Sequence, residues 1–365
     1  MNKEYNYKIL VINPGSTSTA ISVFQGEKEL FQKTIRHSLE ELKKYEKLMD
    51  QYPFREQVIL ESLKENNFSL DEFDAIVGRG GILSPLASGT YYINQAMLEE
   101  LRERPRVEHA SNLAAQVAYE IAQKIMVPSF IVDPVAVDEM EPIARISGLP
   151  EIKRESLSHA LSLKAAARRA AQEIGKPYQE LNMIVIHLGG GISISAHQKG
   201  RMIDVNDASS EGPFSAERSG GLPVQALIKM CYSGQYTLQE MRNKVMGKGG
   251  IVAYLGTNNT LEVEELISNG NQDAELIYKA MAYQIAKCIG EMATVLKGKV
   301  DCIVITGNGA GDKGALGNTF VSWIKERVKF IAPVMVFPGS EEMKALAMGA
   351  IRILSGEEKP KVYNS

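Results

Sequence analysis

The sequence predicts an α/β protein made of two similar halves, because three features recur in the same order along the chain. Given for the N-terminal and the C-terminal half in turn, they are a glycine hairpin (8–30, 183–205), a strand ending in glycines (74–81, 301–309) and a strand ending at a proline (130–134, 334–338). Small residues that merely punctuate strands would not be expected to recur in one order, so we favour an internal duplication.

The two glycine hairpins align without a gap when the chain is shifted by 174 positions. The shift places Asn13 on His187 and Gly15 on Gly189, directly after matching runs of β-branched residues. Because glycine lets backbone N–H groups approach an anion closely, each turn is a candidate phosphate site. One such turn is a weak signal, and its repetition strengthens it.

The composition is that of a globular protein with room for two domains. Of the 365 residues, 44% are apolar and 23% are charged, and the formal net charge is −3. This balance gives no reason to expect nucleic acid or a membrane surface as a partner, and no apolar run is long enough to span a bilayer. The cysteines, Cys231, Cys288 and Cys302, are scattered in apolar sequence, as is typical of reduced thiols. With no signal peptide, the expected location is the cytoplasm.

Hydrophobic periodicity and capping residues predict the remaining elements. In the N-terminal half, strands are expected at 71–83, 90–93 and 130–138, and helices at 38–47, 57–64, 94–104 and 109–124. In the C-terminal half, helices are expected at 156–174, 222–232, 237–246, 261–269, 273–296, 319–330 and 341–354.

Ser147–Pro150 is the best candidate for a domain boundary. The expected domains are therefore 1–148 and 149–340, with the C-terminal segment 341–365 joining the first. The loop at 206–223 offers little for packing, and loops of this length are usually functional or disordered.

Several common catalytic signatures are missing from the sequence. It has no G-x-x-x-x-G-K-[ST] loop, no complete G-x-G-x-x-G, no G-x-S-x-G and no H-E-x-x-H. Hydride transfer, serine hydrolysis and zinc catalysis therefore lack their usual motifs. What remains is three glycine-rich turns at strand ends, residues 15–19, 189–191 and 306–311.

Charged residues near these turns complete a candidate phosphoryl-transfer site. Arg79 and Arg218 lie in glycine-flanked loops, from which a planar guanidinium can reach a phosphoryl group. Asp133 follows a strand and Glu341 begins a helix, so either carboxylate could hold Mg²⁺ directly or through water. Phosphoryl transfer relies mainly on positioning and charge neutralisation, which these groups can supply.

These motifs resemble those of the butyrate kinases, a branch of the acetate kinase family in the acetate-and-sugar-kinase, Hsp70 and actin superfamily. The matching segments cover nearly the whole chain in family order and are specific when taken together. They are NPGSTST (13–19), VGRGG (77–81), HASNL (109–113), IVDP (131–134), PIARISG (142–148), HLGGG (187–191), GPFSAERSG (212–220), AYLGT (253–257) and residues 338–349.

The resemblance implies two duplicated βββαβαβα domains of the actin-like ATPase type, with the active site in the cleft between them. It implies reversible, Mg²⁺-dependent transfer of the γ-phosphoryl of ATP to butyrate or a short-chain or branched relative, giving butanoyl phosphate and ADP. It also implies a homodimer or a higher homo-oligomer. The carboxylate substrate is already ionised, so the reaction requires no general base.

Positions that match active-site residues of the family are expected to play the same roles here. The catalytic set is Asn13, Arg79, Asp133, His159, His187, Arg218 and Glu341, of which Asp133 and Glu341 are also expected to bind the metal. The nucleotide-binding set is Gly15, Ser16, Thr17, Ser18, Gly189, Gly190, Gly191, Thr306, Gly307, Asn308 and Gly309. Glu342 is the alternative metal ligand. The chain departs from the family pattern at Ala20, where lysine is usual, and at Asn308, where glycine is usual.

Other activities stay open. An acetate or propionate kinase would share the mechanism, a nucleotide-switch ATPase like Hsp70 or actin would hydrolyse ATP, and a degenerate relative would do neither. Among the histidines, His37 and His197 lie in polar sequence and are expected at the surface. His109 is expected either to cap its helix or to line the substrate cleft.

Overall fold

The computed structural model describes residues 6–311, 318–339 and 341–364, and the chain divides into two compact units. Unit 1 runs to Val137 and includes the C-terminal segment from Glu341, and unit 2 runs from Asp138 to residue 340. The division falls before the boundary expected at residue 148. The segment after Val137 belongs to unit 2 because it bonds there: Glu141 N donates to Ile203 O at 2.9 Å.

Unit 1 is built on a seven-stranded sheet in the order β12-β5-β6-β4-β1-β2-β3. β1, β4 and β6 run parallel to one another, and β2 and β3 continue the sheet as antiparallel strands. The strands are β1 (Lys8–Pro14), β2 (Ser18–Gln25), β3 (Lys28–Arg36), β4 (Ala75–Gly78), β5 (Thr90–Tyr92), β6 (Ser129–Val132) and β12 (Lys361–Val362). The helices are α1 (Leu39–Leu42), α2 (Tyr52–Glu65), α3 (Gln95–Glu103), α4 (Asn112–Ile125) and α12 (Glu342–Leu354).

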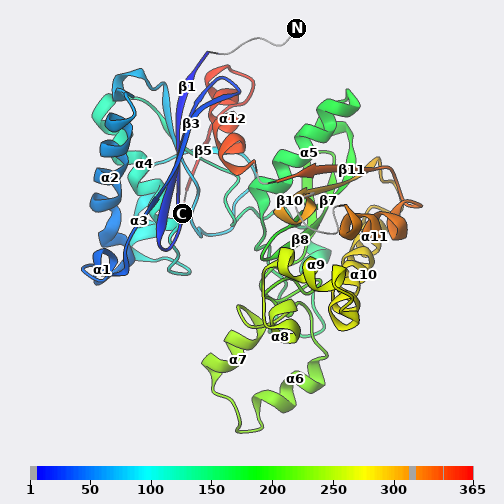
Figure 1. The fold of residues 1–365 in the computed structure, drawn as a ribbon. Helices are drawn as coiled ribbons and strands as arrows, with labels where there is room; N and C mark the ends of the chain where they lie inside the picture. Colours follow the sequence, from blue (N-terminus) through cyan, green and yellow to red (C-terminus); the bar gives the residue numbers. More distant parts are fainter. Residues whose placement is uncertain (1–5, 312–317, 340, 365) are drawn as a thin grey trace. The chain divides into compact units, whose positions relative to one another are not determined.

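Helices pack on both faces of this sheet, with α2, α3 and α4 on one side and α12 on the other (Figure 1). Two glycines allow the closest approaches. A Cβ on Gly78 would lie 2.5 Å from the carbonyl oxygen of Ala114 in α4, and a Cβ on Gly349 in α12 would lie 2.4 Å from Val132 Cγ2. The C-terminal helix is therefore an integral layer of unit 1.

Unit 2 is built on a five-stranded sheet in the order β11-β10-β7-β8-β9. Its strands are β7 (Asn182–Leu188), β8 (Ile192–Gln198), β9 (Arg201–Val205), β10 (Cys302–Gly307) and β11 (Val334–Pro338). Its helices are α5 (Ala160–Ile174), α6 (Val224–Cys231), α7 (Leu238–Val245), α8 (Ile251–Leu255), α9 (Thr260–Ser268), α10 (Gln272–Val295) and α11 (Thr319–Val328).

The two sheets repeat one topology, as the duplicated sequence predicts. The order β3-β2-β1-β4-β6 in unit 1 matches β9-β8-β7-β10-β11 in unit 2, with the same parallel and antiparallel pairs. Both second strands also carry a register shift, between Val23 and Phe24 and between Ala196 and His197. A β-bulge is a specific feature of a fold, so its repetition supports duplication independently of the glycines. The first turns differ by one residue (15–18 against 189–191), which the gapless alignment did not show.

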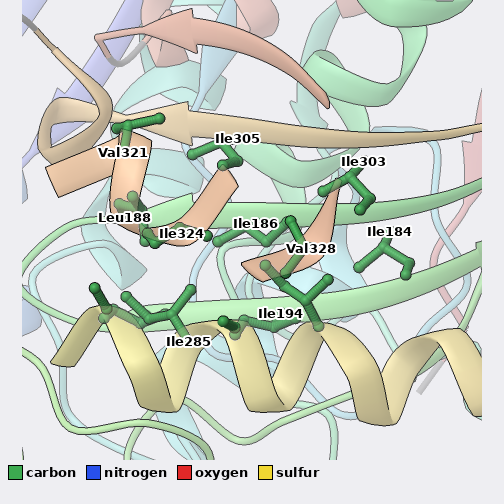
Figure 2. Packing of buried hydrophobic residues seen from close by; sticks show 14 of the residues in the cluster. Ile184, Ile186, Leu188, Ile194, Ile285, Ile303, Ile305, Val321, Ile324 and Val328 are labelled. Carbon is green, nitrogen blue, oxygen red and sulfur yellow. The ribbon is translucent and has the colours of Figure 1, made fainter. Parts of the chain in front are cut away.

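The core of unit 2 lies between its sheet and the helices α10 and α11 (Figure 2). β7 and β10 are buried along almost their whole length, as their continuous apolar sequence predicts for central parallel strands. Ile194 of β8 and Ile285 of α10 meet in this core, and Ile324 comes from α11. A rigid base of this kind holds the ends of the central strands in place.

Most expected helices are present, with differences at their ends. The stretch expected at 38–47 forms only the short α1, whose N-cap Ser38 makes a capping box with Glu41. The helix expected at 57–64 begins earlier, at Tyr52, with Pro53 in its first turn. None of the helices in the described ranges is long and apolar enough to cross a membrane.

Candidate active site

Three expected residues of unit 1 lie at one edge of its sheet. β1, β4 and β6 run parallel, so their carboxyl ends share this edge. Asn13 is near the end of β1, Arg79 directly follows β4 and Asp133 directly follows β6. The carboxyl edge of parallel strands is where open α/β sheets bind ligands, so local strand order alone brings these three residues together.

Arg79 is held by an acidic residue of the C-terminal helix. Its Nη1 donates to Oε2 of Glu342 at 2.7 Å, and Asn13 Nδ2 approaches the same oxygen at 3.5 Å. Glu341, the residue that the sequence singled out, is the N-cap residue of α12. Glu342 is therefore the glutamate that contacts Arg79 and Asn13. Spacing cannot separate two adjacent glutamates at a helix start, and only the structure shows which one faces Arg79.

Asp133 is buried in an uncommon backbone conformation. It is 1% exposed, and its φ of +39° is rare for a residue other than glycine. Its Oδ1 accepts hydrogen bonds from Ser88 Oγ at 2.6 Å and from Gly89 N at 2.7 Å. Strained residues that the surrounding structure holds in place cluster at functional sites. The two bonds orient this carboxylate at the sheet edge.

The first glycine turn, residues 15–18, lies at this same edge between the last paired residues of β1 and β2, Pro14 and Thr19. Ser16 and Thr17 are exposed at its tip, and Gly15 N donates to Ser18 O at 2.8 Å across its base. His109, which the sequence left between two roles, bonds to Ser111 Oγ at 2.8 Å near the start of α4. Burial and the charge of Arg79 lower the pKa of His109.

In unit 2, His159 and His187 stack face to face. Their ring centroids are 4.2 Å apart and their planes differ by 17°. His187 lies near the end of β7, the strand that corresponds to β1, and His159 is the N-cap residue of α5. Ser193 Oγ lies 2.8 Å from Nδ1 of His159 and ties it to β8. Two residues far apart in sequence thus form one aromatic pair at the carboxyl end of β7.

The second glycine turn, residues 189–191, packs directly against Arg218. A Cβ on Gly191 would lie 2.4 Å from Arg218 Nη1, and a Cβ on Gly189 would lie 2.9 Å from His187 Nε2. Ser215 Oγ donates to Gly190 O at 2.6 Å and fastens the loop to the turn. The structure therefore brings His187, the glycine turn and Arg218 together, and these glycines are needed for close packing as well as for any anion.

Within the described part of the chain, Arg218 is held by a carbonyl and a hydroxyl oxygen and not by an acid. Its Nη1 donates to Ala208 O at 2.8 Å, and its backbone N donates to Ser215 Oγ at 3.2 Å. Its Nε is buried and, among the described residues, has no hydrogen-bond partner. A buried donor without a partner is costly, which makes this guanidinium a candidate for an anionic ligand.

The third turn lies beside the second. Thr306 is level with His187 in the sheet, and Gly307 has a φ of +100°. A Cβ on Gly307 would lie 2.3 Å from the carbonyl oxygen of Leu188. Asn308, where the sequence departs from the family pattern, begins a short 3-10 turn with Gly309 and is exposed. The whole expected turn, 306–311, lies within the described residues.

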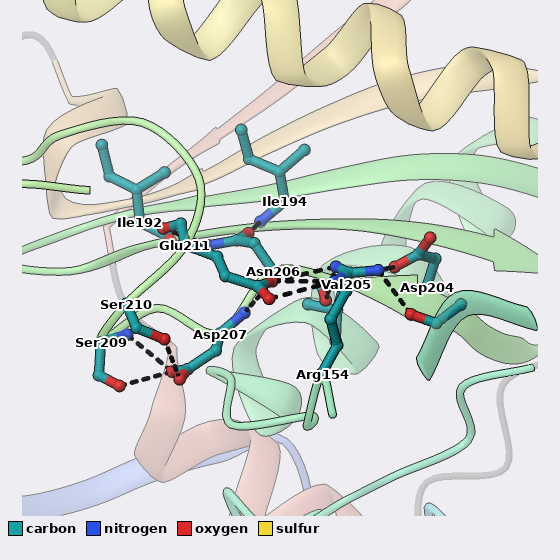
Figure 3. Close-up of polar contacts among 11 residues, drawn as sticks. Arg154, Ile192, Ile194, Asp204, Val205, Asn206, Asp207, Ser209, Ser210 and Glu211 are labelled. Atoms are coloured by element: carbon teal, nitrogen blue, oxygen red, sulfur yellow. Dashed lines mark hydrogen bonds and ion pairs between the residues drawn. The ribbon is translucent and has the colours of Figure 1, made fainter. Parts of the chain in front are cut away.

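Arg154 ties the long loop of unit 2 to its sheet (Figure 3). It donates to Asp204 Oδ1 at 3.0 Å, to Val205 O at 3.1 Å and to Glu211 Oε2 at 3.0 Å. Although burial lowers the pKa of Arg154, the bonds to Glu211 and Asp204 outweigh it, and the pKa is raised. This network fixes the start of the loop that carries Arg218. No motif in the sequence indicates this network, because the partners come from separate segments.

Asn206 anchors the same loop through its side-chain amide (Figure 3). Its Oδ1 accepts from Ile194 N at 2.6 Å and its Nδ2 donates to Ile192 O at 3.0 Å, so it extends the ladder of β8. The segment expected to be functional or disordered is therefore an ordered loop. Its position is set by these side-chain bonds and by Phe214, which is buried in the core of unit 2.

The surface positions expected for His37 and His197 are wrong. His37 is buried against Thr19 Oγ1 at 2.8 Å, and burial, with the charge of Arg55, lowers its pKa. His197 is fully buried, bonded to Tyr178 Oη at 2.6 Å and to Ser195 Oγ at 2.9 Å. His197 lies in β8, where polar neighbours in sequence do not indicate exposure because alternate residues of a strand point to opposite faces.

The carboxylates of unit 1 are oxygen donors of the kind that Mg²⁺ prefers. Asp133 is buried and oriented, and Glu341 and Glu342 begin α12 at the same sheet edge. Within the described ranges, no three His, Cys, Asp or Glu side chains are grouped as a ready-made metal cage. This donor set fits Mg²⁺ bound in the usual way, through one or two carboxylates with phosphate and water completing the shell.

Comparison with known proteins identifies the family. The profile of the Acetokinase family matches residues 152–322. The chain is 53% identical over 359 residues to a probable butyrate kinase of Clostridium botulinum (strain Eklund 17B / Type B), covering 98% of this chain and 100% of that protein. The chain belongs to the acetokinase family.

A second relative, butyrate kinase 2 of Clostridium acetobutylicum, is 51% identical over 358 residues, covering 98% of this chain and 99% of that one. Among solved structures, acetate kinase of Porphyromonas gingivalis superposes with a TM-score of 0.78 at 21% identity, covering 95% of this chain and 100% of that one. The family expected from the motifs and the two-domain α/β fold are therefore confirmed.

Proposed function

We propose that this protein is a short-chain carboxylate kinase that reversibly transfers the γ-phosphoryl of ATP to butyrate or a branched relative. The observation that carries the proposal is the cluster in unit 2, where His187, the glycine turn 189–191 and Arg218 pack together at one strand end. An imidazole, a guanidinium and backbone N–H groups are what a moving phosphoryl requires. The names of the curated relatives point to butyrate as the acid.

In the proposed reaction, a carboxylate oxygen of the acid attacks the γ-phosphorus while the bond from that phosphorus to the β–γ bridging oxygen breaks. The products are butanoyl phosphate and ADP. Negative charge spreads over three equatorial oxygens in the transition state, where Arg79, Arg218 and His187 would donate hydrogen bonds. The glycine turns would hold the other phosphates, and Asn13 and His159 would position these groups.

Asp133, with Glu341 or Glu342, would hold Mg²⁺ at the edge of unit 1. When bound, the ion would neutralise charge on the β- and γ-phosphates. The role of the chain itself is to orient these carboxylates, as Ser88 and Gly89 do for Asp133. Because Arg79 belongs to unit 1 and Arg218 to unit 2, the proposal requires one ATP to be served by both units. The homo-oligomer and the cytoplasmic location stay predictions.

The test is a panel of C2 to C6 acids with ATP and Mg²⁺, in which hydroxylamine traps the acyl phosphate as a hydroxamate. We expect a C3 to C5 acid to be preferred over acetate, because each methylene buried in an apolar pocket contributes roughly 1 kcal/mol. Equal or better turnover of acetate would instead indicate an acetate kinase with the same mechanism. ADP without hydroxamate would indicate a nucleotide switch, and neither product would indicate a degenerate relative.

A further inference from the structure

Arg55 lies beneath the first glycine turn and has no role in the reaction as proposed above. It belongs to α2 and is 0% exposed, which makes it one of the largest fully buried side chains. Fully buried arginines are normally paired with an acid. In the part of the chain that the structure describes, Arg55 bonds only to neutral oxygens and has no carboxylate partner.

Most of these oxygens belong to the turn itself. Nη1 of Arg55 donates to Gly15 O at 2.8 Å and to Ser18 O at 2.7 Å, and Nη2 donates to Ser16 O at 3.0 Å. Gln51, the N-cap residue of α2, accepts from Nη2 at 2.9 Å through its Oε1 and holds the guanidinium from that side. One side chain thus binds three backbone carbonyls within four residues.

This contact determines the direction of the backbone N–H groups. Within one planar trans peptide, the C=O and the N–H of the next residue point in opposite directions. Because Arg55 binds Gly15 O and Ser16 O, the N–H groups of Ser16 and Thr17 point away from it. Both residues are exposed, and neither backbone N donates to another group among the described residues.

The turn therefore combines two outward N–H groups with a buried positive charge behind them. Burial lowers the pKa of Arg55 to about 10, so the guanidinium remains protonated at neutral pH. Successive N–H groups that point to one side form an anion site, and a nearby cation without an acid partner strengthens the attraction. A neutral residue at position 55 would remove both the orientation and the charge.

We infer that Arg55 is a positioning residue that holds the turn 15–18 with its N–H groups directed at a phosphate of ATP. The inference rests on the proposed function, since it takes ATP as the ligand of this turn. The guanidinium does not itself touch the nucleotide. It acts through Gly15, Ser16 and Ser18, so its effect should appear in nucleotide binding and not in binding of the acid.

The variants Arg55→Gln and Arg55→Lys test this role in the full chain. For Arg55→Gln we expect the KM for Mg·ATP to rise about 10- to 100-fold, and the increase in Tm caused by Mg·ADP to shrink, with the KM for butyrate unchanged. Arg55→Lys keeps the charge but reaches fewer carbonyls, so it should recover part of the ATP affinity. A lower Tm with an unchanged KM for Mg·ATP and an unchanged Mg·ADP shift would overturn the inference.

A milder variant and a matched control complete the experiment. Gln51→Met removes the acceptor that holds Arg55 from the N-cap of α2, so it should raise the KM for Mg·ATP by a smaller factor. It tests the same contact if Arg55→Gln does not fold. Lys164→Met removes another fully buried cation, one bonded to Glu139 in unit 2. This control should lower Tm without changing the KM for Mg·ATP. An equal effect of both substitutions on that KM would contradict a specific role for Arg55.

Failure of the proposed function can be told apart from failure of this inference. Suppose that wild-type protein forms no hydroxamate, but Mg·ADP raises its Tm more than it raises the Tm of the Arg55 variants. The kinase assignment then fails and the role of Arg55 is supported. If wild-type protein forms hydroxamate and the Arg55 variants bind Mg·ADP normally, the kinase assignment stands and the role of Arg55 is overturned.

Discussion

Single residues at the candidate site differ in how the structure holds them. Arg79 has an acidic partner, Glu342, whereas Arg218 is held by the carbonyl of Ala208 and by the packing of Gly191. A guanidinium that serves only the transition state affects turnover more than substrate binding. The two arginines should therefore share a kinetic effect while differing in their effect on stability.

We expect Arg79→Ala and Arg218→Ala each to lower kcat by about 10²- to 10⁴-fold with little change in ATP affinity. Lysine should rescue poorly at both positions, because it lacks the planar fork. Arg79→Ala should also lower Tm, since it leaves Glu342 without its ion pair. Measuring kcat, ATP affinity and Tm on each variant tests this. Folded variants with nearly normal kcat would exclude both arginines from the reaction.

Buried histidines should make stability depend on pH below neutrality. Burial, with the charges of Lys164 and Arg168, lowers the pKa of His197 well below its ordinary value. The unfolded chain therefore binds a proton near pH 6.5 that the folded chain does not. The stability that neutral His197 contributes is complete above pH 6.5 and is lost as the pH falls towards the lowered pKa, by up to about 1.4 kcal/mol per pH unit.

The variant His197→Gln removes this titration while keeping groups that can bond to Tyr178 and Ser195. Urea unfolding between pH 5 and pH 7 should give a flatter pH profile than that of the wild type. His37 and His109 also have lowered pKa values and remain in both proteins, so the difference reports His197 alone. If the wild type and the variant give parallel profiles, His197 does not cause the loss of stability at acidic pH.

At the scale of elements, the glycines in the turns of unit 2 have two different roles: one makes room for a side chain and another for backbone. Gly191 makes room for the flexible end of Arg218, whereas Gly307 makes room for the backbone of Leu188. A side chain can move aside at low cost, but a backbone carbonyl in a sheet cannot. Substitutions at the two positions should therefore have different consequences.

Gly191→Ala should displace the guanidinium of Arg218, which a new Cβ would approach to 2.4 Å, and lower kcat by about 10²-fold with a small change in Tm. Gly307→Ala should instead destabilise the fold by roughly 1–3 kcal/mol or more, because its φ is +100° and its Cβ would meet Leu188 O. Gly148→Ala is the control, since no atom lies within 4 Å of its Cβ. If Gly191→Ala lowers Tm as much as Gly307→Ala does, Gly191 serves the stability of the fold and not the position of Arg218.

At the scale of the whole molecule, the expected site residues are divided between two units. Asn13, Arg79 and Asp133 lie in unit 1, and His159, His187 and Arg218 lie in unit 2. Each unit has its own sheet and its own buried hydrophobic residues, as expected of domains that close on a ligand by moving as bodies. The proposed reaction needs groups from both units at one phosphoryl group. We therefore expect a conformational change when the ligands bind.

We expect saturating Mg·ATP and substrate to bring the two units together. Small-angle scattering should then show a smaller radius of gyration than for the protein without ligands, because closure excludes water and completes the constellation. A single-ligand control with Mg·ATP alone separates nucleotide-driven closure from closure by the acid. An unchanged radius under saturation would count against a reaction that uses both units.

The sequence by itself determined the family, the duplicated α/β fold and most of the strand-end residues. The reason is local: β-branched runs followed by glycine or proline define strands and their ends, and parallel strands bring those ends to one edge. Asn13, Arg79 and His187 could be placed in this way before any contact was known. The repeated bulge, between Val23 and Phe24 and between Ala196 and His197, agrees with the duplication. The amino-acid composition of the two strands did not predict it.

Only the tertiary structure decided which groups touch. That Glu342 faces Arg79, that His159 stacks on His187 and that Arg55 binds the first turn depends on the packing of helices onto strands far away in the sequence. A side chain's burial also depends on which face of a strand is covered, so His197 was misjudged from its polar neighbours. Patterns in a sequence report periodicity along one element, whereas contacts between elements arise from the three-dimensional fold.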